Sequence, residues 1–344
     1  MTLADTLAGI VATDQGAYAD ALEHQLRLAK PPHSLGRLEA LGAQLAAIAG
    51  RCPPPPPEPA RIVVAAGDHG VVAQSVTRWP PELSGVLAVT VAEGVAGVNV
   101  LAALAGAQVR VLDVGLRAAV AGVEALPVRR GTGDITVTTA MHRGEAIAAV
   151  ELGIREAESA ADQGIRCLAT GEVGIGNTTP AAALIAVFTR SEAAAVTGRG
   201  ADSQPEMVAH KVAMVARALD LHRPDPADPI GVLAAVGGGE VAVLTGLVLG
   251  AARCRLPILL DGVTGAAAGL AAVALCPSVA GYLVAAHAGA EPGIAMANRQ
   301  LGLDPVLDLG LALGEGTGAA LALPILRAAV AVMTDMATLE SLLG

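Results

Sequence analysis

The sequence predicts an α/β fold in which a mostly parallel sheet is flanked by helices, with a small helical subdomain beside it. Two observations predict this fold. From about residue 60, short β-branched runs alternate with longer Ala-rich stretches, which is typical of βαβ units around a sheet buried on both faces. The two ends of the chain show helical periodicity alone. We therefore expect a large α/β domain over residues 60–318 and a helical subdomain over residues 1–52 and 319–344.

The N-terminal segment has the pattern of two amphipathic helices, over residues 14–30 and 34–50. Ser34 is the expected N-cap of the second helix, and Gly50 is its expected C-terminal stop. A run of prolines at residues 53–57 follows as a stiff spacer. The C-terminal segment predicts two further helices, which would complete the subdomain.

Six apolar runs between these ends predict parallel strands, and each is followed by a cluster of glycine with an acid or a histidine. The runs are residues 62–66, 109–112, 165–169, 258–260, 283–286 and 306–307. Ligands of open parallel sheets bind in the crevice outside the carboxyl ends of the strands. Because six loops of this composition meet at one edge of the expected sheet, we predict an enzyme site there rather than ordinary turns.

The loop GEVGIGNTTP, residues 171–180, carries the strongest single signal. Its glycines let the backbone turn sharply and approach a ligand closely. Asn177, Thr178 and Thr179 follow at an expected helix start, where unpaired N–H groups and the helix dipole attract an anion such as phosphate. Glu172 lies beside them in the sequence. Taken alone, the loop is equally compatible with a Gly-rich turn before a well-capped helix.

Other segments supply further charged groups. Arg199, between two glycines, and Lys211, in a later helical run, are candidates to neutralise a monophosphate. Lys211 by itself is more typical of a solvated surface charge. Glu315 lies between glycines directly before an apolar helix. It is a candidate general base, and the alternative is a glutamate that stabilises a helix start.

Composition argues against two classes of partner. The net charge of −10 and the aromatic content of 1% remove the electrostatic and stacking basis for binding nucleic acid. Residues 262–290 contain no Asp, Glu, Lys or Arg and are long enough to span a bilayer. Their Gly, Ala and Pro content favours a buried helix, a turn and a buried strand. We therefore expect neither a nucleic-acid nor a membrane partner.

The four cysteines lie far apart and form no CxxC motif, which favours free thiols in a reducing cytoplasm. The first residues carry Asp5 and no basic segment, so we expect no signal peptide. The chain has no P-loop motif, no GxGxxG fingerprint and no HExxH cluster. We therefore expect a cytoplasmic enzyme that uses neither a cofactor nor a metal.

Taken together, the motifs resemble those of the nicotinate-nucleotide–dimethylbenzimidazole phosphoribosyltransferase family. They occur in the family's order and cover the chain from about residue 14 to residue 343. The motifs GEVGIGNTT and LGEGTGAALA are specific to this family, whereas GDHG or GRG alone would not identify it. The motifs are KPPHSLGRLE (30–39), AAGDHGVV (65–72), GEVGIGNTTPAAAL (171–184), GRG…K (198–211), EVAVLTG (240–246), LLDGV (259–263), HAGAEPG (287–293) and DLGLALGEGTGAALALP (308–324).

The resemblance implies transfer of 5-phosphoribosyl from nicotinate mononucleotide to 5,6-dimethylbenzimidazole. The products would be α-ribazole 5′-phosphate and nicotinate, in the assembly of the lower ligand of cobalamin. Nicotinate bound to C1′ is a ring-nitrogen cation and a good leaving group, so the implied chemistry needs no metal. The resemblance also implies a homodimer whose subunits each hold a large Rossmann-like domain and a small helical one.

Roles for individual residues follow from the resemblance. Glu315 matches the family's general base, and Glu172 matches a carboxylate that orients or polarises near the ribose and the acceptor. The residues assigned to the phosphate and ribose are Gly174, Gly176, Asn177, Thr178, Thr179, Arg199, Lys211 and Asp261. The residues assigned to the acceptor pocket are Trp79, Pro80, Val86, Leu87 and Leu313.

The chain departs from the family's pattern at several positions. Val86 stands in place of the Gln that borders the acceptor pocket, which removes a polar contact to the acceptor. This suggests a drift in the preferred acceptor. The other departures are His33 for Gly, Asp134 for Asn, Ile294 for His, and Ala201 with Asp202 for Thr-Gly.

Two alternative functions stay open at this point. One is the same reaction with another acceptor, such as another benzimidazole, a purine or a phenol. The other is a non-catalytic protein that binds the nucleotide or a benzimidazole. The presence of both Glu172 and Glu315 argues against the second, because mere binding of a neutral aromatic has little use for carboxylates.

Overall fold

The computed structural model describes residues 1–201 and 204–343. These residues form a six-stranded parallel sheet with the strand order β3-β2-β1-β4-β5-β6. The strands are β1 (Ala60–Gly67), β2 (Ala107–Gly115), β3 (Glu124–Ala125), β4 (Cys167–Val173), β5 (Ile258–Leu260) and β6 (Leu283–Ala285). The predicted α/β fold is confirmed, and the direction in which successive strands are added reverses between β1 and β4.

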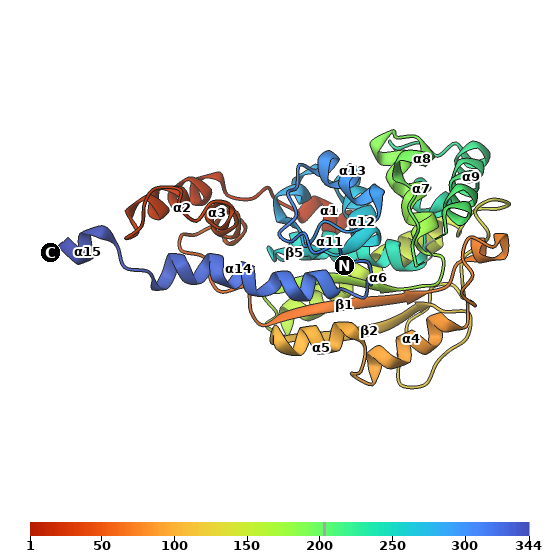
Figure 1. The fold of residues 1–344 in the computed structure, drawn as a ribbon, viewed down its shortest axis with the longest axis horizontal. Coiled ribbons are helices and arrows are strands. Elements are labelled where there is room, and N and C mark those ends of the chain that lie inside the picture. Colours follow the sequence, from red (N-terminus) through yellow and green to blue (C-terminus); the bar gives the residue numbers. More distant parts are fainter. Residues whose placement is uncertain (202–203, 344) are drawn as a thin grey trace.

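Helices cover both faces of the sheet. Figure 1 shows α4 (Leu83–Ala92) and α5 (Gly97–Leu104) on one side of β1 and β2, and α11 (Gly239–Arg253) and α12 (Gly262–Leu275) on the other. α6 (Arg143–Asp162) packs on α11. The two backbones approach closely, because a Cβ atom at Gly153 would lie 1.8 Å from the carbonyl oxygen of Val243. Small side chains thus build a dense core with few aromatics.

A second, smaller group of helices projects from this body (Figure 1). It contains α2 (Gln15–Arg27), α3 (Arg37–Ala49) and the C-terminal part of α14 (Thr317–Asp335), followed by α15 (Leu339–Leu343). Its own apolar cluster consists of Ala21, Ala43, Ala46 and Met333. The N-terminal helix α1 (Leu3–Gly9) was expected in the small helical subdomain, but it packs against α6 and α11 of the large body.

The remaining helical elements lie mostly beyond the carboxyl ends of the strands or between them. α7, α8 and α9 gather at the end of the molecule opposite α15 (Figure 1). The elements are η1 (Gly70–Gln74), α7 (Thr178–Thr189), α8 (Ala193–Val196), α9 (Pro205–His222), α10 (Pro229–Val236), η2 (Pro277–Tyr282) and α13 (Pro292–Leu301).

Three local predictions are wrong. Ser34 does not cap α3, whose N-cap is Gly36 with φ of 54° and no side-chain hydrogen bond. Residues 306–307 form only an isolated bridge, between Leu307 and His287. β4 continues through Glu172, which was expected in a loop, because its parallel pairing with β1 extends to the end of the strand. The two-residue strand β3 has no apolar pattern that could have predicted it.

By length and composition alone, two helical stretches within residues 1–201 and 204–343 could cross a membrane, Leu83–Leu104 and Thr317–Asp335. The first comprises α4 and α5, and 28% of its most apolar window is buried; for the second, α14, the value is 56%. The run at residues 262–290 instead contains α12, η2 and β6, which is the predicted sequence of helix, turn and strand.

Candidate active site

A cavity of about 290 Å³ lies at the carboxyl edge of the sheet, beside the point where the strand order reverses. It is lined by the end of β4, the start of α7, the segments after β5 and β6, α4 with the segment before it, and residues 311–315. Eight of the predicted site residues line it: Trp79, Leu87, Glu172, Gly174, Asn177, Thr178, Leu313 and Glu315. The position agrees with the general rule for open parallel sheets.

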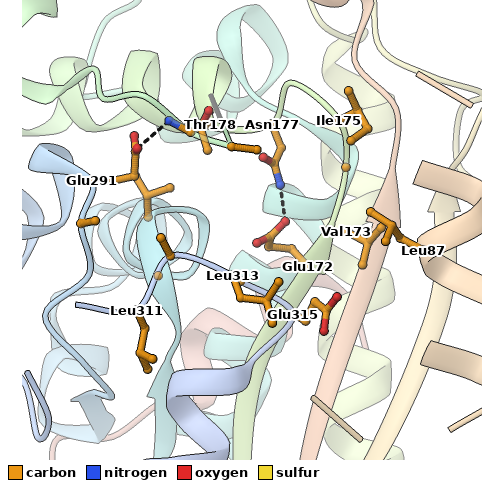
Figure 2. A pocket seen from close by; sticks show the side chains of 18 of the residues that line it. Leu87, Glu172, Val173, Ile175, Asn177, Thr178, Glu291, Leu311, Leu313 and Glu315 are labelled. Atoms are coloured by element: carbon orange, nitrogen blue, oxygen red, sulfur yellow. Dashed lines mark hydrogen bonds between the residues drawn. The ribbon is translucent and has the colours of Figure 1, made fainter. Parts of the chain in front are cut away.

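Glu172 is the penultimate residue of β4 and reaches into the cavity (Figure 2). Its Oε2 accepts a hydrogen bond from Nδ2 of Asn177. Asn177 is the N-cap of α7, yet its side chain makes no capping bond because it is turned to Glu172 instead. The protein surrounding Glu172 raises its pKa to about 8, first through burial and then through the negative charges of Glu240 and Asp261.

Glu315 enters the cavity from the loop before α14 (Figure 2). Its backbone is left-handed, with φ of 62°, a conformation that costs a non-glycine residue energy and often occurs at functional sites. The loop passes directly over β4: a Cβ atom at Gly171 would lie 2.4 Å from the carbonyl oxygen of Glu315. Glu315 is only 8% exposed, and its Oε2 accepts a hydrogen bond from the N–H of Val98 at 3.2 Å.

Asp261, expected at the substrate, instead holds this loop in place. Its carboxylate accepts hydrogen bonds from the N–H groups of Gly316 at 3.2 Å and Ala319 at 2.9 Å, at the start of α14. Nε2 of His287 lies 3.4 Å from the same carboxylate. Burial opposes the charged form of His287, but the hydrogen bond and charge of Asp261 outweigh it and raise the pKa of the ring. Asp261 is 3% exposed and does not line the cavity.

The start of α7 lies at the end of the cavity where the sequence predicts binding of a phosphate. Lys211, from α9, is 2% exposed, and its Nζ donates a hydrogen bond to Oγ1 of Thr178 at 2.7 Å. The N–H of Gly200 donates to Oε1 of Glu291 at 2.7 Å, which ties the loop before α9 to the start of α13. A buried ammonium beside a helix N-terminus provides two attractive interactions with a phosphate.

Other predicted site residues do not line the cavity. Gly176 is turned against Val72 in a left-handed conformation, with φ of 87°, and Thr179 is fully buried. Arg199 is exposed. Pro80 and Val86 lie on the surface, and Val86 is 57% exposed. The structure therefore gives no support to a drift in acceptor preference caused by Val86.

The other departures from the family's pattern have separate surroundings. The side chain of His33 is 82% exposed, with its Nδ1 3.8 Å from Glu39. Asp134 accepts hydrogen bonds from Gln74 and Thr136. Ile294 is buried and lines the cavity, and Asp202 lies outside the described residues.

His287 and Glu291 line the cavity although no role was assigned to them from the sequence. Both belong to the motif HAGAEPG, which directly follows β6 at the carboxyl edge. Their position after a predicted strand is the sequence feature that could have identified them as site residues. Among residues 1–201 and 204–343, no three His, Cys, Asp or Glu side chains are grouped so as to hold a metal.

Comparisons with known proteins agree with this site. The model of a family described as Phosphoribosyltransferase matches residues 10–342. The nicotinate-nucleotide–dimethylbenzimidazole phosphoribosyltransferase of Salinispora tropica is 51% identical, over 99% of this chain and 98% of that protein. The enzyme of the same name from Solidesulfovibrio magneticus is 46% identical, over 98% and 97%.

A crystal structure of CobT from Thermus thermophilus superimposes on this chain with a TM-score of 0.90 and 40% identity. The match covers 94% of this chain and 98% of that one. Sequence and structure thus agree over nearly the whole length of both proteins. The chain therefore belongs to the phosphoribosyltransferase family that contains these nicotinate-nucleotide–dimethylbenzimidazole enzymes.

Proposed function

We propose that this chain transfers 5-phosphoribosyl from nicotinate mononucleotide to 5,6-dimethylbenzimidazole, giving α-ribazole 5′-phosphate and nicotinate for the lower ligand of cobalamin. The names of its relatives fit this reaction and neither of the alternative functions. The observation that carries the proposal is that Glu172 and Glu315 line one cavity that also reaches Thr178, the hydrogen-bond partner of Lys211.

The donor phosphate binds at the start of α7. The N–H groups of the first helical turn and the ammonium of Lys211 attract its negative charge. Gly174, Asn177 and Thr178 line the cavity at this point. Four further residues contribute to substrate binding without lining the cavity. Gly176 and Thr179 shape the loop before α7, and Arg199 contributes its positive charge. Asp261 holds the loop that carries Glu315.

The reaction is a displacement at C1′ of the ribose. A bond forms from one acceptor nitrogen to C1′ while the bond from C1′ to the nicotinate nitrogen breaks, and its electron pair neutralises the pyridinium. The proton on the other ring nitrogen of the acceptor passes to the carboxylate of Glu315. Holding both reactants in line contributes several kcal/mol, on the order of the entropy of a bimolecular encounter.

Glu172 has the complementary role. With a pKa of about 8 its carboxyl is protonated at neutral pH, and Oε2 is already bonded to Asn177. It therefore donates a hydrogen bond to the ribose or the acceptor rather than removing a proton. Glu172 as a hydrogen-bond donor and Glu315 as the base thus divide the acid and base tasks of one site.

The acceptor ring lies against the apolar part of the cavity. Trp79, Leu87 and Leu313 line this part, and their contact with the ring buries apolar area on both sides. Pro80 and Val86 lie outside the lining, so we assign them no direct contact with the acceptor.

We further propose that the enzyme is a cytoplasmic homodimer without a membrane or nucleic-acid partner. The surface of α4 and α5 supports pairing with a second copy, since Val86, Val95, Val100 and Leu104 are 57%, 66%, 58% and 83% exposed. An apolar surface of this kind commonly marks an interface. Light scattering on the purified protein measures its mass, and a monomer would contradict this proposal.

The experiment that tests the function is incubation of the purified protein with nicotinate mononucleotide and 5,6-dimethylbenzimidazole, without added metal. We expect α-ribazole 5′-phosphate and nicotinate in equal amounts, identified by mass and retention. A panel of purines, phenols and other benzimidazoles runs beside it. Turnover of another acceptor with none of 5,6-dimethylbenzimidazole would overturn the assignment, and nucleotide binding without any product would favour a carrier.

A further inference from the structure

A second cavity, with a volume of about 320 Å³, lies at the amino edge of the sheet, and we call it the amino-edge cavity. Arg166 lines it and directly precedes β4, and Pro257 lines it and directly precedes β5. The penultimate residue of β4 is Glu172, which lines the candidate active site. The two cavities therefore lie at opposite ends of one strand, and the reaction proposed above makes no use of the amino-edge cavity.

Three arginines line the amino-edge cavity: Arg51, Arg166 and Arg255. Arg51 follows α3, in the smaller group of helices, whereas Arg166 and Arg255 follow α6 and α11 of the large body. The described residues that line the cavity include no Asp or Glu. Like charges that face one space repel one another, and an anion placed between them turns this repulsion into attraction. The side chains of the lining thus favour a negatively charged ligand.

Other cavities that contain arginine have a carboxylate in the same lining. Arg190 and Arg223 line a cavity together with Asp225. Arg110 lines another together with Glu124, and the two side chains form an ion pair at 2.9 Å. The amino-edge cavity differs from both because its own lining does not balance its positive charge. In a chain with a net charge of −10, this local excess of positive charge is not a general property of the surface.

Two of the three guanidinium groups are unpaired. Within residues 1–201 and 204–343, those of Arg51 and Arg166 make no hydrogen bond or ion pair. Arg255 donates from Nε to the carbonyl oxygen of Ile48 at 3.1 Å and from Nη2 to that of Ala47 at 3.4 Å. A cation at a helix C-terminus offsets the partial negative charge of the last carbonyls, which explains Arg255 at the end of α3. This role does not explain Arg166, which precedes a strand.

The rest of the lining is largely apolar. It includes the prolines at residues 55–57 together with Leu45, Ile48 and Leu256. Proline has no side-chain rotamer freedom to lose, so contact with a ligand costs this part of the wall little entropy. Apolar surface gains free energy when a ligand covers it, and guanidinium groups stack on planar rings. A ligand that joins a phosphate to a planar ring therefore matches the lining better than an inorganic anion does.

We propose that the amino-edge cavity binds a small phosphorylated ligand of about the size of a mononucleotide. The planar fork of a guanidinium group matches two phosphate oxygens. Arg51 and Arg166 supply two unpaired forks, while Arg255 adds its charge and keeps its bonds to α3. The volume of about 320 Å³ is close to the 290 Å³ of the candidate active site. The net charge of −10 opposes binding of a long polyanion, so nucleic acid is not the ligand.

A ligand in this cavity would join two parts of the molecule. Its phosphate would bond to Arg51 of the smaller group of helices and to Arg166 of the large body. A ligand that binds only the folded chain raises the free energy of unfolding. Adenosine 5′-monophosphate should therefore raise the Tm of the protein, and it should do so much less in Arg51→Gln or in Arg166→Gln.

Titration calorimetry at constant ionic strength, with inorganic phosphate and adenosine 5′-monophosphate as probes, tests the proposal directly. The parent protein is Lys211→Met, in which the candidate active site has lost the ammonium expected to attract phosphate. We expect adenosine 5′-monophosphate to bind this protein at least about tenfold more tightly than phosphate, because it also covers the apolar wall. Arg51→Gln or Arg166→Gln, each added to the parent, should weaken binding of both probes by about 10–100-fold, through the loss of hydrogen bonds to a charged group.

Arg190→Gln is the matched control. Arg190 is exposed and lines the cavity that contains Asp225, so its substitution in the same parent should leave both affinities unchanged. Arg51 and Arg166 are also exposed, so their substitutions leave the core intact. Arg255 is not substituted, because it holds the end of α3.

Two results would overturn the proposal as a whole. One is the absence of binding of either probe at millimolar concentration. The other is binding with the same affinity in the parent, in Arg51→Gln and in Arg166→Gln. Equal affinity for phosphate and adenosine 5′-monophosphate would overturn the assignment of a mononucleotide-sized ligand. None of these measurements depends on turnover, so the result is independent of the proposed function.

Discussion

The cavity has two sides that the chain builds in different ways. Its inner wall, represented by Glu172, Thr178 and Glu315, consists of polar side chains whose partners are already in place. Its outer rim, represented by Trp79 and Leu313, is apolar, and these two side chains are 39% and 62% exposed. The polar side chains of the inner wall are thus held by hydrogen bonds within the protein, whereas the rim side chains are partly exposed.

This difference separates two tasks of one site. Polar groups that are held in place contribute to the rate because they need not reorganise as charge moves in the transition state. Apolar surface contributes to binding roughly in proportion to the area buried and has little directional preference. Substitutions in the inner wall should therefore lower the rate, and substitutions at the rim should change acceptor affinity by less.

Glu315→Gln is expected to have the largest effect. Loss of the base should lower kcat by about 10²–10⁴-fold, with both KM values nearly unchanged, because the amide keeps the shape of the side chain. The rate of α-ribazole 5′-phosphate formation measures this. Glu23→Gln, at an exposed carboxylate paired with Arg27, is the control and should be fully active. A loss smaller than about tenfold would remove Glu315 from the role of base.

Lys211→Met tests the anion-binding end of the inner wall. Loss of the buried ammonium should lower kcat/KM for nicotinate mononucleotide by about 10–100-fold, in line with a hydrogen bond to a charged group. Affinity for 5,6-dimethylbenzimidazole should stay the same. Arg199→Met, at an exposed position, is the matched comparison and should change kcat/KM by much less. Equally weakened binding of both substrates would argue for a general structural effect.

Glu172 gives the inner wall a pH-dependent stability. Its pKa is about 8 in the folded chain and near 4.5 for the free side chain, so the folded state binds a proton that the unfolded state releases. This contribution is complete below about pH 4.5 and is lost as pH rises to about 8. Denaturant unfolding at pH 6 and pH 9 measures the free energy of unfolding. Between these two pH values, the wild-type protein should lose at least about 1.4 kcal/mol more of this free energy than Glu172→Gln. Equal losses would mean that Glu172 is not protonated in the fold.

The rim should give the smallest effects. Leu313→Ala removes exposed apolar surface that lines the cavity and should raise KM for the acceptor by a few-fold, on the order of 1 kcal/mol. Val86→Gln changes a residue outside the lining, so acceptor preference should change by less than about threefold, as for other surface substitutions. A strong gain in selectivity in the Val86→Gln protein would restore the contact that the sequence suggested.

Much of the fold was predictable because its signals are local. Five of the six apolar runs are strands, and the loops that follow β4, β5 and β6 contribute residues to the cavity. The sixth run, residues 306–307, has the same apolar character but pairs only through a bridge to His287. Composition cannot distinguish a strand from another extended segment, because the difference depends on whether a neighbouring strand pairs with the segment along its length. The division into domains stays a prediction, and α1 packs differently from what it assumed.

The order of residues was enough to predict a parallel sheet, the edge where ligands bind, and two glutamates as the reactive groups. Local periodicity and glycine-rich strand ends carry this information. Tertiary structure alone decided that Asp261 holds the Glu315 loop, that Val86 lies outside the cavity lining, and that Glu172 keeps its proton. Side-chain direction and ionisation depend on contacts between segments far apart in the chain, which no local pattern contains.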